Sequence, residues 1–179
     1  MRAIYGLIAL SLLVQITGCD NNTPLMDSAL EGDKKAVVAL LDQGTNVDEV
    51  NGYRWTALMH AAKAGNLEMV NLLLERKANV NAKDSNKRTA LVKAVLAGHD
   101  EVVATLLQHG AMVNDLDELG RAPLHWAAAK GYLKIAELLV QHGADVNLKT
   151  NDGWTPGALA AREGEAEVVN LLEKAGAKR

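Results

Sequence analysis

The sequence has no phenylalanine, a single cysteine and few aromatic residues of any kind, although it is 179 residues long. The length is sufficient for one domain. About half of the residues are apolar, and because aromatic residues are few, leucine, valine and alanine must fill its core. One cysteine excludes internal disulfide bonds, thiolate metal cages and a redox-active thiol pair. The formal net charge of −3 offers no basic surface for nucleic acid, and no run of like charge indicates a disordered tail.

Motifs for catalysis and metal binding are also missing from the sequence. Beyond the leader, the only serines are Ser28 and Ser85, and neither lies in a Gly-x-Ser-x-Gly motif. The histidines show no pair at metal-ligand spacing on one helix. Asp117 and Glu118 lie in an expected turn, where solvated carboxylates are the ordinary interpretation. We therefore expect no enzymatic activity, no cofactor and no metal ion.

The first eighteen residues differ in composition from the rest of the chain. A positive charge at Arg2 precedes an almost wholly apolar segment over residues 3–14, and the small residues Thr17 and Gly18 follow. This order is typical of a secretory signal peptide. The apolar run is far shorter than the roughly 20 residues that a membrane-spanning helix needs. We expect residues 1–18 to be cleaved from the mature chain.

The end of this segment, Ile16-Thr17-Gly18-Cys19, resembles the bacterial lipobox, in which an aliphatic residue and two small residues precede a cysteine. The resemblance implies that the Cys19 thiol receives a diacylglycerol and that its amino group is acylated after cleavage. Several acyl chains on one residue give firm anchoring. Residues 19–22 would then be the lipidated cysteine and a short tether. The other interpretation is an unmodified leader cysteine.

Asp20 follows the cysteine and bears on which membrane holds the chain. An aspartate at this position resembles the signal for retention in the inner membrane of enteric-type bacteria. The expected location is therefore the cell envelope, lipid-anchored and facing the periplasm. The inner membrane is favoured by Asp20, and the outer membrane is the alternative.

The rest of the chain repeats itself every 33 residues. Threonine recurs on this grid with one alanine in its place, and glycine and leucine recur in phase with it. The members are Thr23, Thr56, Thr89, Ala122 and Thr155; Gly32, Gly65, Gly98, Gly131 and Gly164; and Leu40, Leu73, Leu106, Leu139 and Leu172. Self-similarity at this period indicates stacked supersecondary units.

The residue order within each unit predicts two short helices. Threonine on the grid is expected to be an N-cap, often followed by proline, and the grid glycine ends the first helix. A second helix is expected over residues 67–76, 101–109, 133–142 and 166–174, with glycine C-caps at positions 44, 110, 143 and 176. Lys77 replaces that glycine in the second unit, so its cap should be weaker. Turn residues such as Asn51-Gly52 then predict a short hairpin between units.

One unit matches a known family closely. The segments Gly120-Arg121-Ala122-Pro123-Leu124-His125-Trp126-Ala127-Ala128 and Gly143-Ala144-Asp145-Val146-Asn147 resemble the ankyrin repeat. The resemblance extends over residues 23–177 as about five repeats, which start near 23, 56, 89, 122 and 155. It implies an all-α repeat solenoid of helix-turn-helix units joined by β-hairpin loops. Only His125 keeps the family histidine, so its hydrogen bonds are not expected in the other four repeats.

One position in repeats two to five is explained neither by helix caps nor by the core. The residue directly before the grid position is Trp55, Arg88, Arg121 and Trp154. The resemblance implies that this position lies exposed on the hairpin and faces the concave side, where partners bind. Tryptophan and arginine are enriched at binding hot spots, and arginine pairs bidentately with carboxylates.

Neighbouring variable positions extend this candidate protein-binding surface. They are Val50, Tyr53, Leu116 and Leu119 on the hairpins, and Lys63, Trp126 and Lys130 on the first helices. Apolar residues on turns have no core to fill in this architecture, which favours contact with a partner. The alternative is local packing, in which each tryptophan lies on the adjacent hairpin and stiffens the stack.

These features predict a membrane-anchored periplasmic protein that binds a protein partner and not nucleic acid, as a monomer or within a hetero-complex. The partner is expected to present carboxylates beside apolar surface. One interpretation is an inhibitor, such as an immunity protein against a toxin enzyme that acts in the envelope. A second is an assembly or maintenance factor for a periplasmic enzyme or complex. A third is a passive structural spacer without a discrete partner.

Overall fold

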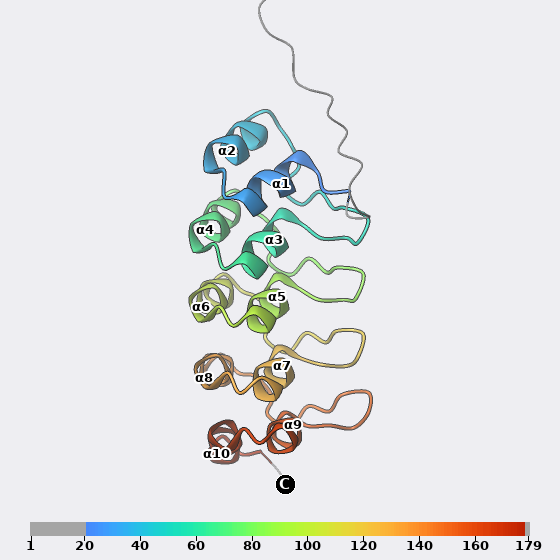
Figure 1. The fold of residues 1–179 in the computed structure, drawn as a ribbon, viewed down its shortest axis with the longest axis vertical. Coiled ribbons are helices and arrows are strands. Elements are labelled where there is room, and N and C mark those ends of the chain that lie inside the picture. Colours follow the sequence, from blue (N-terminus) through green and yellow to red (C-terminus); the bar gives the residue numbers. More distant parts are fainter. Residues whose placement is uncertain (1–20, 178–179) are drawn as a thin grey trace, which may run out of the picture.

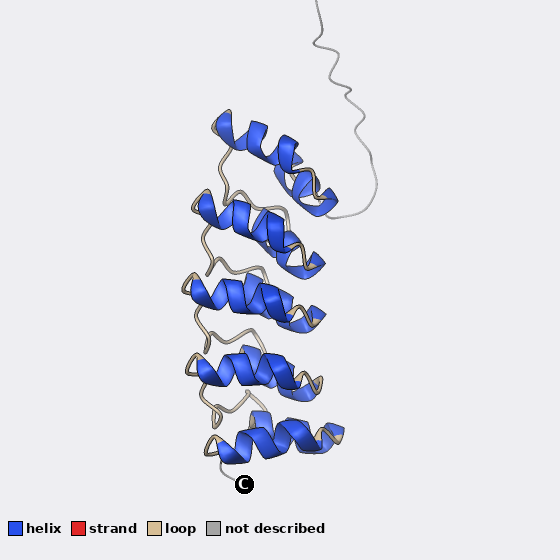
Figure 2. Ribbon diagram, turned by 90° about the vertical axis from the view of Figure 1, so that its left-hand side faces the viewer, coloured by secondary structure: helices blue, strands red, loops and turns tan. Residues whose placement is uncertain are grey.

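The computed structural model describes residues 21–177, which form ten helices arranged as five consecutive pairs (Figure 1). The first helices of successive pairs pack directly on one another, and the second helices form a parallel row (Figure 2). The residues expected to form the signal peptide, together with Cys19 and Asp20, lie outside the described part of the chain. The helices are α1 Pro24–Glu31, α2 Lys34–Asp42, α3 Ala57–Ala64, α4 Leu67–Glu75, α5 Ala90–Ala97, α6 Asp100–Gln108, α7 Pro123–Ala129, α8 Leu133–Gln141, α9 Pro156–Glu163 and α10 Ala166–Lys174.

The expected caps define the first helix of each pair. In four units the threonine hydroxyl accepts a hydrogen bond from the backbone N–H three residues later, at 3.2–3.4 Å. This satisfies one of the N–H groups that a helix start leaves without an intrahelical partner. The grid glycine then ends the helix in the left-handed region, for example Gly65 at φ 73°. Both predictions from the 33-residue grid are confirmed.

The second helices agree with the expected ranges to within one residue at each end. Left-handed glycines follow them at positions 44, 110, 143 and 176, with φ between 83° and 93°. Lys77 adopts the same conformation in the second unit, with φ 68°. Because a side chain disfavours this region, the second unit carries strain that the glycine-capped units avoid.

The fourth unit begins differently because its grid residue is alanine. The His125 ring instead accepts a hydrogen bond at Nδ1 from the Ala122 backbone N–H, at 3.1 Å. Its Nε2 lies 3.0 Å from the Leu148 carbonyl oxygen and 3.2 Å from that of Trp154, both in the next loop. This completely buried ring therefore connects the start of α7 to the hairpin that follows it.

The loops between repeats project from one side of the stack as narrow hairpins (Figure 1). Neighbouring hairpins share a backbone hydrogen bond, such as Ser85 N–H to the Tyr53 carbonyl at 3.0 Å and Glu118 N–H to the Asn86 carbonyl at 3.1 Å. These isolated bonds do not build a ladder, and residues 21–177 contain no β-strand. The expected hairpin loops are thus present in shape, without regular β structure.

A further set of hydrogen bonds joins the repeats in the loops that follow the second helices. Asn81 donates to the Gly110 carbonyl at 3.1 Å and accepts from the Met112 backbone N–H at 2.9 Å. Asn114 makes the same two bonds one repeat later, to Gly143 and Asp145. Each repeat therefore contacts its neighbour through both a shared apolar core and polar bonds, as is typical of solenoids.

Candidate functional site

In each hairpin, the side chain of one turn residue holds the backbone of the residue that directly precedes the grid position (56, 89, 122 or 155). We call the four residues at that position, Trp55, Arg88, Arg121 and Trp154, the stripe. The backbone N–H of each donates to a side-chain oxygen four residues earlier, at 2.8–3.1 Å. The acceptors are Asn51, Asp84, Asp117 and Thr150, all less than 9% exposed. The stripe residues therefore leave their loops with the same backbone geometry in each repeat.

Asp117 organises the centre of the stripe. One carboxylate oxygen accepts the turn bonds from Leu119 and Arg121, and the other accepts from Trp126 Nε1 at 3.1 Å and Arg88 Nε at 3.3 Å. The carboxylate is almost completely buried. The expectation that Asp117 is a solvated turn carboxylate is wrong, because four donors replace the water around it.

The Trp126 indole, presented by α7, contacts both arginines of the stripe. The guanidinium carbons of Arg88 and Arg121 are 5.0 Å and 4.4 Å from its ring centroid. Stacking of this kind is favourable and holds each planar guanidinium in one orientation. The site thus presents two oriented cations on adjacent repeats.

Trp55 has an equivalent but lysine-rich environment. Lys93 Nζ lies 3.7 Å from its ring centroid and forms a 2.5 Å ion pair with Asp84. Both charged groups are buried, and burial lowers the pKa of Lys93 while the Asp84 carboxylate acts in the opposite direction. The Nζ of the exposed Lys63 lies 5.2 Å from the centroid of the same ring.

The last stripe residue, Trp154, is the most open of the tryptophans. It is 39% exposed, and Arg162 from α9 lies 5.2 Å from its ring centroid. Trp55 and Trp126, in contrast, are half-buried and pack against the core cluster. Arg88 and Arg121 are half-buried as well. Within the stripe, the expected exposure is therefore found at Trp154, whereas Trp55, Arg88 and Arg121 are half-buried where a cation and an indole contact each other.

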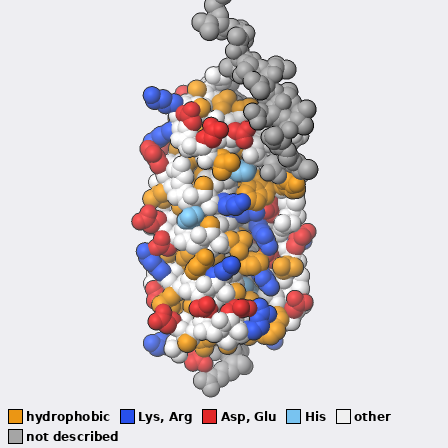
Figure 3. Space-filling model, viewed as in Figure 1, with side chains coloured by type: hydrophobic (Ala, Val, Ile, Leu, Met, Phe, Trp, Pro, Cys, Tyr) orange, Lys and Arg blue, Asp and Glu red, His pale blue; other side chains and the backbone are white. Residues whose placement is uncertain are grey.

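The remaining expected contact residues lie where the sequence placed them. Val50, Tyr53, Leu116 and Leu119 are exposed on the hairpins, at 39–47%. Lys63 and Lys130 are exposed at the ends of α3 and α7. In the face shown in Figure 3, basic and apolar side chains adjoin one another down the middle of the stack. The structure thus brings the expected residues together on the hairpins and first helices.

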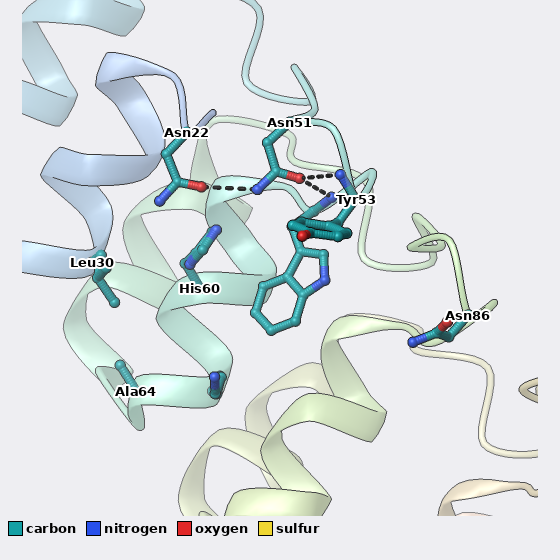
Figure 4. A pocket seen from close by; sticks show the side chains of 9 residues that line it. Asn22, Leu30, Asn51, Tyr53, His60, Ala64 and Asn86 are labelled. Atoms are coloured by element: carbon teal, nitrogen blue, oxygen red, sulfur yellow. Dashed lines mark hydrogen bonds between the residues drawn. The ribbon is translucent and has the colours of Figure 1, made fainter. Parts of the chain in front are cut away.

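Trp55 lines two hollows. The larger has a volume of about 560 Å³ and is lined by Tyr53, Trp55, His60 and Lys63, with amides from three asparagines. Figure 4 shows Asn51 at its rim, where its amide donates to the Asn22 side chain at 2.8 Å. The smaller hollow, about 290 Å³, lies between Trp55, Arg88 and Lys93. Each combines an indole wall with at least one cation.

With this architecture established, comparison with known families gives a match over nearly the whole chain. A family model described as ankyrin repeats (3 copies) matches residues 1–84, 78–150 and 117–178. The chain belongs to the ankyrin-repeat family. Ankyrin repeats are protein–protein interaction modules, so the chain is a repeat solenoid of the protein-binding kind. No curated protein matches the sequence.

Residues 21–177 contain no cluster of three or more histidine, cysteine, aspartate or glutamate side chains that could hold a metal ion. No helix in the same part of the chain is long and apolar enough to cross a membrane. The ankyrin surface described above is therefore the candidate site for which this structure supplies geometry.

The turn residues that fix the stripe were not among the expected site residues. Asn51, Asp84, Asp117 and Thr150 follow the 33-residue grid, and this spacing was the available signal. Because an amide, two carboxylates and a hydroxyl occupy this position, their common role as turn acceptors is not evident from residue type. Each nevertheless provides an oxygen that accepts from the backbone N–H four residues later.

Proposed function

We propose that this ankyrin-repeat chain is a lipid-anchored periplasmic protein that binds a partner protein through the stripe and its neighbours. The observation that carries the proposal is the pair of arginines stacked on Trp126, flanked by Trp55 and Trp154. Side chains already ordered in the free protein lose less entropy on binding, about 0.5–1.5 kcal/mol for each. The surface therefore suits tight contact with a folded or extended protein segment.

The chemistry of the surface indicates the partner's chemistry. Two guanidinium groups can each receive a carboxylate, and the exposed Tyr53, Leu116 and Leu119 offer apolar contact beside them. Lys63 and Lys130 add positive charge to the first-helix side. The partner's contact surface is accordingly acidic with apolar residues interspersed.

Affinity capture from membranes tests the proposal. The tagged chain is used as bait beside two variants, Arg121→Gln and Trp154→Ala, and a matched control, Arg54→Gln. Arg54 lies exposed on a hairpin next to Trp55 but outside the stripe, with no ion pair in the described residues. Loss of one hot-spot side chain costs about 2 kcal/mol, or roughly 30-fold in affinity.

The expected result is one specific protein that both stripe variants lose and that Arg54→Gln keeps, with equal helicity in all four proteins. Equal losses of helicity and capture would instead support the local-packing interpretation. If no protein is enriched over an untagged control, a passive spacer is the better description.

Among protein-binding roles, we propose inhibition of an enzyme that acts in the envelope, as an immunity protein would perform it. A lipid on Cys19 would hold the ankyrin surface near the membrane where such an enzyme acts. Deletion of the gene should then poison the cell only when a neighbouring effector gene is intact. Loss of one resident periplasmic activity after deletion, without self-poisoning, would support an assembly or maintenance role instead.

A further inference from the structure

We infer that the segment bound by the stripe is an acidic polyproline II stretch, in which every third residue faces a successive repeat. The inference rests on the proposed function, because it specifies the conformation and spacing of the partner's contact segment. It is carried by the repeat spacing, the orientation of the two arginines and the aromatic walls beside them.

The spacing of the stripe follows from helix packing. The four positions directly precede the N-caps of helices α3, α5, α7 and α9, and these helices pack on one another in order. Axes of packed helices lie about 8–10 Å apart. Because one equivalent hydrogen bond fixes each stripe residue in its loop, consecutive members are separated by about the same distance.

A bound segment can contact successive stripe residues only if its conformation places side chains on the same face about 8–10 Å apart. A polyproline II helix has three residues per turn and advances about 9.3 Å per turn. A β-strand returns to the same face every two residues, after about 6.6 Å, which is too short. An α-helix comes close only at every seventh residue, at about 10.5 Å, and its diameter is about 10–12 Å. The polyproline II repeat therefore fits with the shortest segment.

The two central positions of the stripe are oriented to accept carboxylates. Arg88 uses Nε for Asp117, and its terminal nitrogens have no hydrogen bond within residues 21–177. Arg121 forms no ion pair within the same residues and is held by stacking on Trp126 alone. Both guanidiniums therefore retain terminal N–H donors for bidentate contact with a partner.

The aromatic side chains at the ends of the stripe and beside it favour a bound segment that contains proline. Grooves lined by aromatic side chains are a common way of recognising polyproline II chains. Here Tyr53, Trp55 and Trp126 line the path of the stripe, and the 290 Å³ hollow between Trp55 and Arg88 has room for a prolyl ring. Trp55 and Trp154 at the two ends would contact apolar residues.

The matching segment has ten residues. Apolar residues occupy its positions 1 and 10, acids occupy positions 4 and 7, and prolines at several other positions favour the conformation. The order of the stripe, Trp55, Arg88, Arg121 and Trp154, is the same in both directions, so a segment of either polarity satisfies it.

Titration of the full chain with synthetic peptides, followed by tryptophan fluorescence, tests the inference. The first peptide has glutamates at positions 4 and 7 in a proline-rich background, and its control has the same composition with glutamates at positions 4 and 6. A third peptide carries glutamates seven residues apart in a helix-forming background. The first should bind at least about tenfold more tightly than the control, whose second glutamate misses its arginine. It should also bind more tightly than the helical peptide, because a step of about 9.3 Å fits the spacing of the stripe better than one of about 10.5 Å and the extended chain is narrower than a helix.

A charge exchange tests the register directly. Arg121→Glu should weaken the first peptide by about tenfold or more, and lysine at position 4 or 7 should restore binding in one of the two cases. The control Arg54→Glu should change affinity less than threefold. Three results would overturn the inference. The peptide with glutamates at positions 4 and 7 could bind no better than the control with glutamates at 4 and 6, the helical peptide could bind more tightly, or neither lysine substitution could restore binding to Arg121→Glu. In any of these cases, a captured partner that still depends on Arg121 and Trp154 would leave the proposed function standing.

Discussion

His125 should make the stability of the stack depend on pH. The ring is completely buried, and burial is the main cause that lowers its pKa. Its Nε2 faces two carbonyl oxygens, which only accept, so that nitrogen carries the proton. Its Nδ1 accepts the Ala122 N–H and has no proton. The folded state therefore requires the neutral ring.

The sign of the pH dependence follows from that requirement. The unfolded chain binds a proton at His125 near the ordinary pKa of about 6.5, whereas the folded chain binds it only at lower pH. The contribution of His125 is thus fully present above about pH 6.5 and is lost as the pH falls through the lowered pKa. The free energy of unfolding should decrease between pH 7 and pH 5.

Replacement by leucine removes both the titration and the hydrogen bonds. His125→Leu leaves the Ala122 N–H and the Leu148 carbonyl without these partners, while the Trp154 carbonyl still accepts from Thr150 at 2.9 Å. One buried and one partly buried group without these partners, at about 1–3 kcal/mol each, give an expected loss of about 3 kcal/mol at pH 8. At pH 5 the difference from the parent protein should be smaller.

Urea unfolding, followed by circular dichroism and by tryptophan fluorescence, measures both quantities. His109→Leu is the matched control, because His109 is exposed and its Nδ1 contacts only the Thr105 carbonyl of its own helix. That variant should follow the parent's pH dependence. A His125→Leu penalty that is the same at pH 5 and pH 8 would refute the assignment of an obligatorily neutral ring.

Three further predictions concern single positions. Lys77→Gly should raise the free energy of unfolding by about 1 kcal/mol in urea titrations, because glycine adopts the left-handed conformation at φ 68° without strain. Ala122→Thr should add about 1 kcal/mol in the same assay by supplying the N-cap that the other four repeats have; no gain would show that the His125 bond already replaces it. Cys19→Ser should move the protein from the membrane fraction to the soluble fraction and abolish labelling by fatty acid, and unchanged fractionation would contradict lipid anchoring.

The helices could be predicted from the sequence because their determinants are local. Thr56 and Gly65, for example, lie within one repeat, and each acts through backbone groups no more than four residues away. Because the sequence repeats every 33 residues, the helix pair assigned in one repeat is expected in all five. Helix ends differed by at most one residue, since the capping residues themselves were visible in the sequence.

The electrostatic detail of the site could not be predicted in the same way. Asp117 becomes buried because Arg88, which lies 29 residues earlier in the sequence, and Trp126 reach the same oxygen. Such convergence depends on the separation of neighbouring repeats and on side-chain rotamers, which the period does not encode. The Asp84–Lys93 ion pair also depends on side-chain rotamers, since Asp84 lies in the hairpin before Thr89 and Lys93 lies in α5.

Packing and partner binding are therefore not exclusive roles for the stripe. Asp117 uses one oxygen to build its turn and the other to hold Trp126 and Arg88, so its replacement would disrupt the loop as well as the surface. Arg121 only stacks on Trp126, and its replacement should remove surface with little loss of structure. A double-mutant cycle between Arg121 and Trp126 separates the two contributions. Coupling measured in partner binding that exceeds the coupling measured in stability would show that the stack exists to orient the arginine, and equal couplings would show that it serves the scaffold.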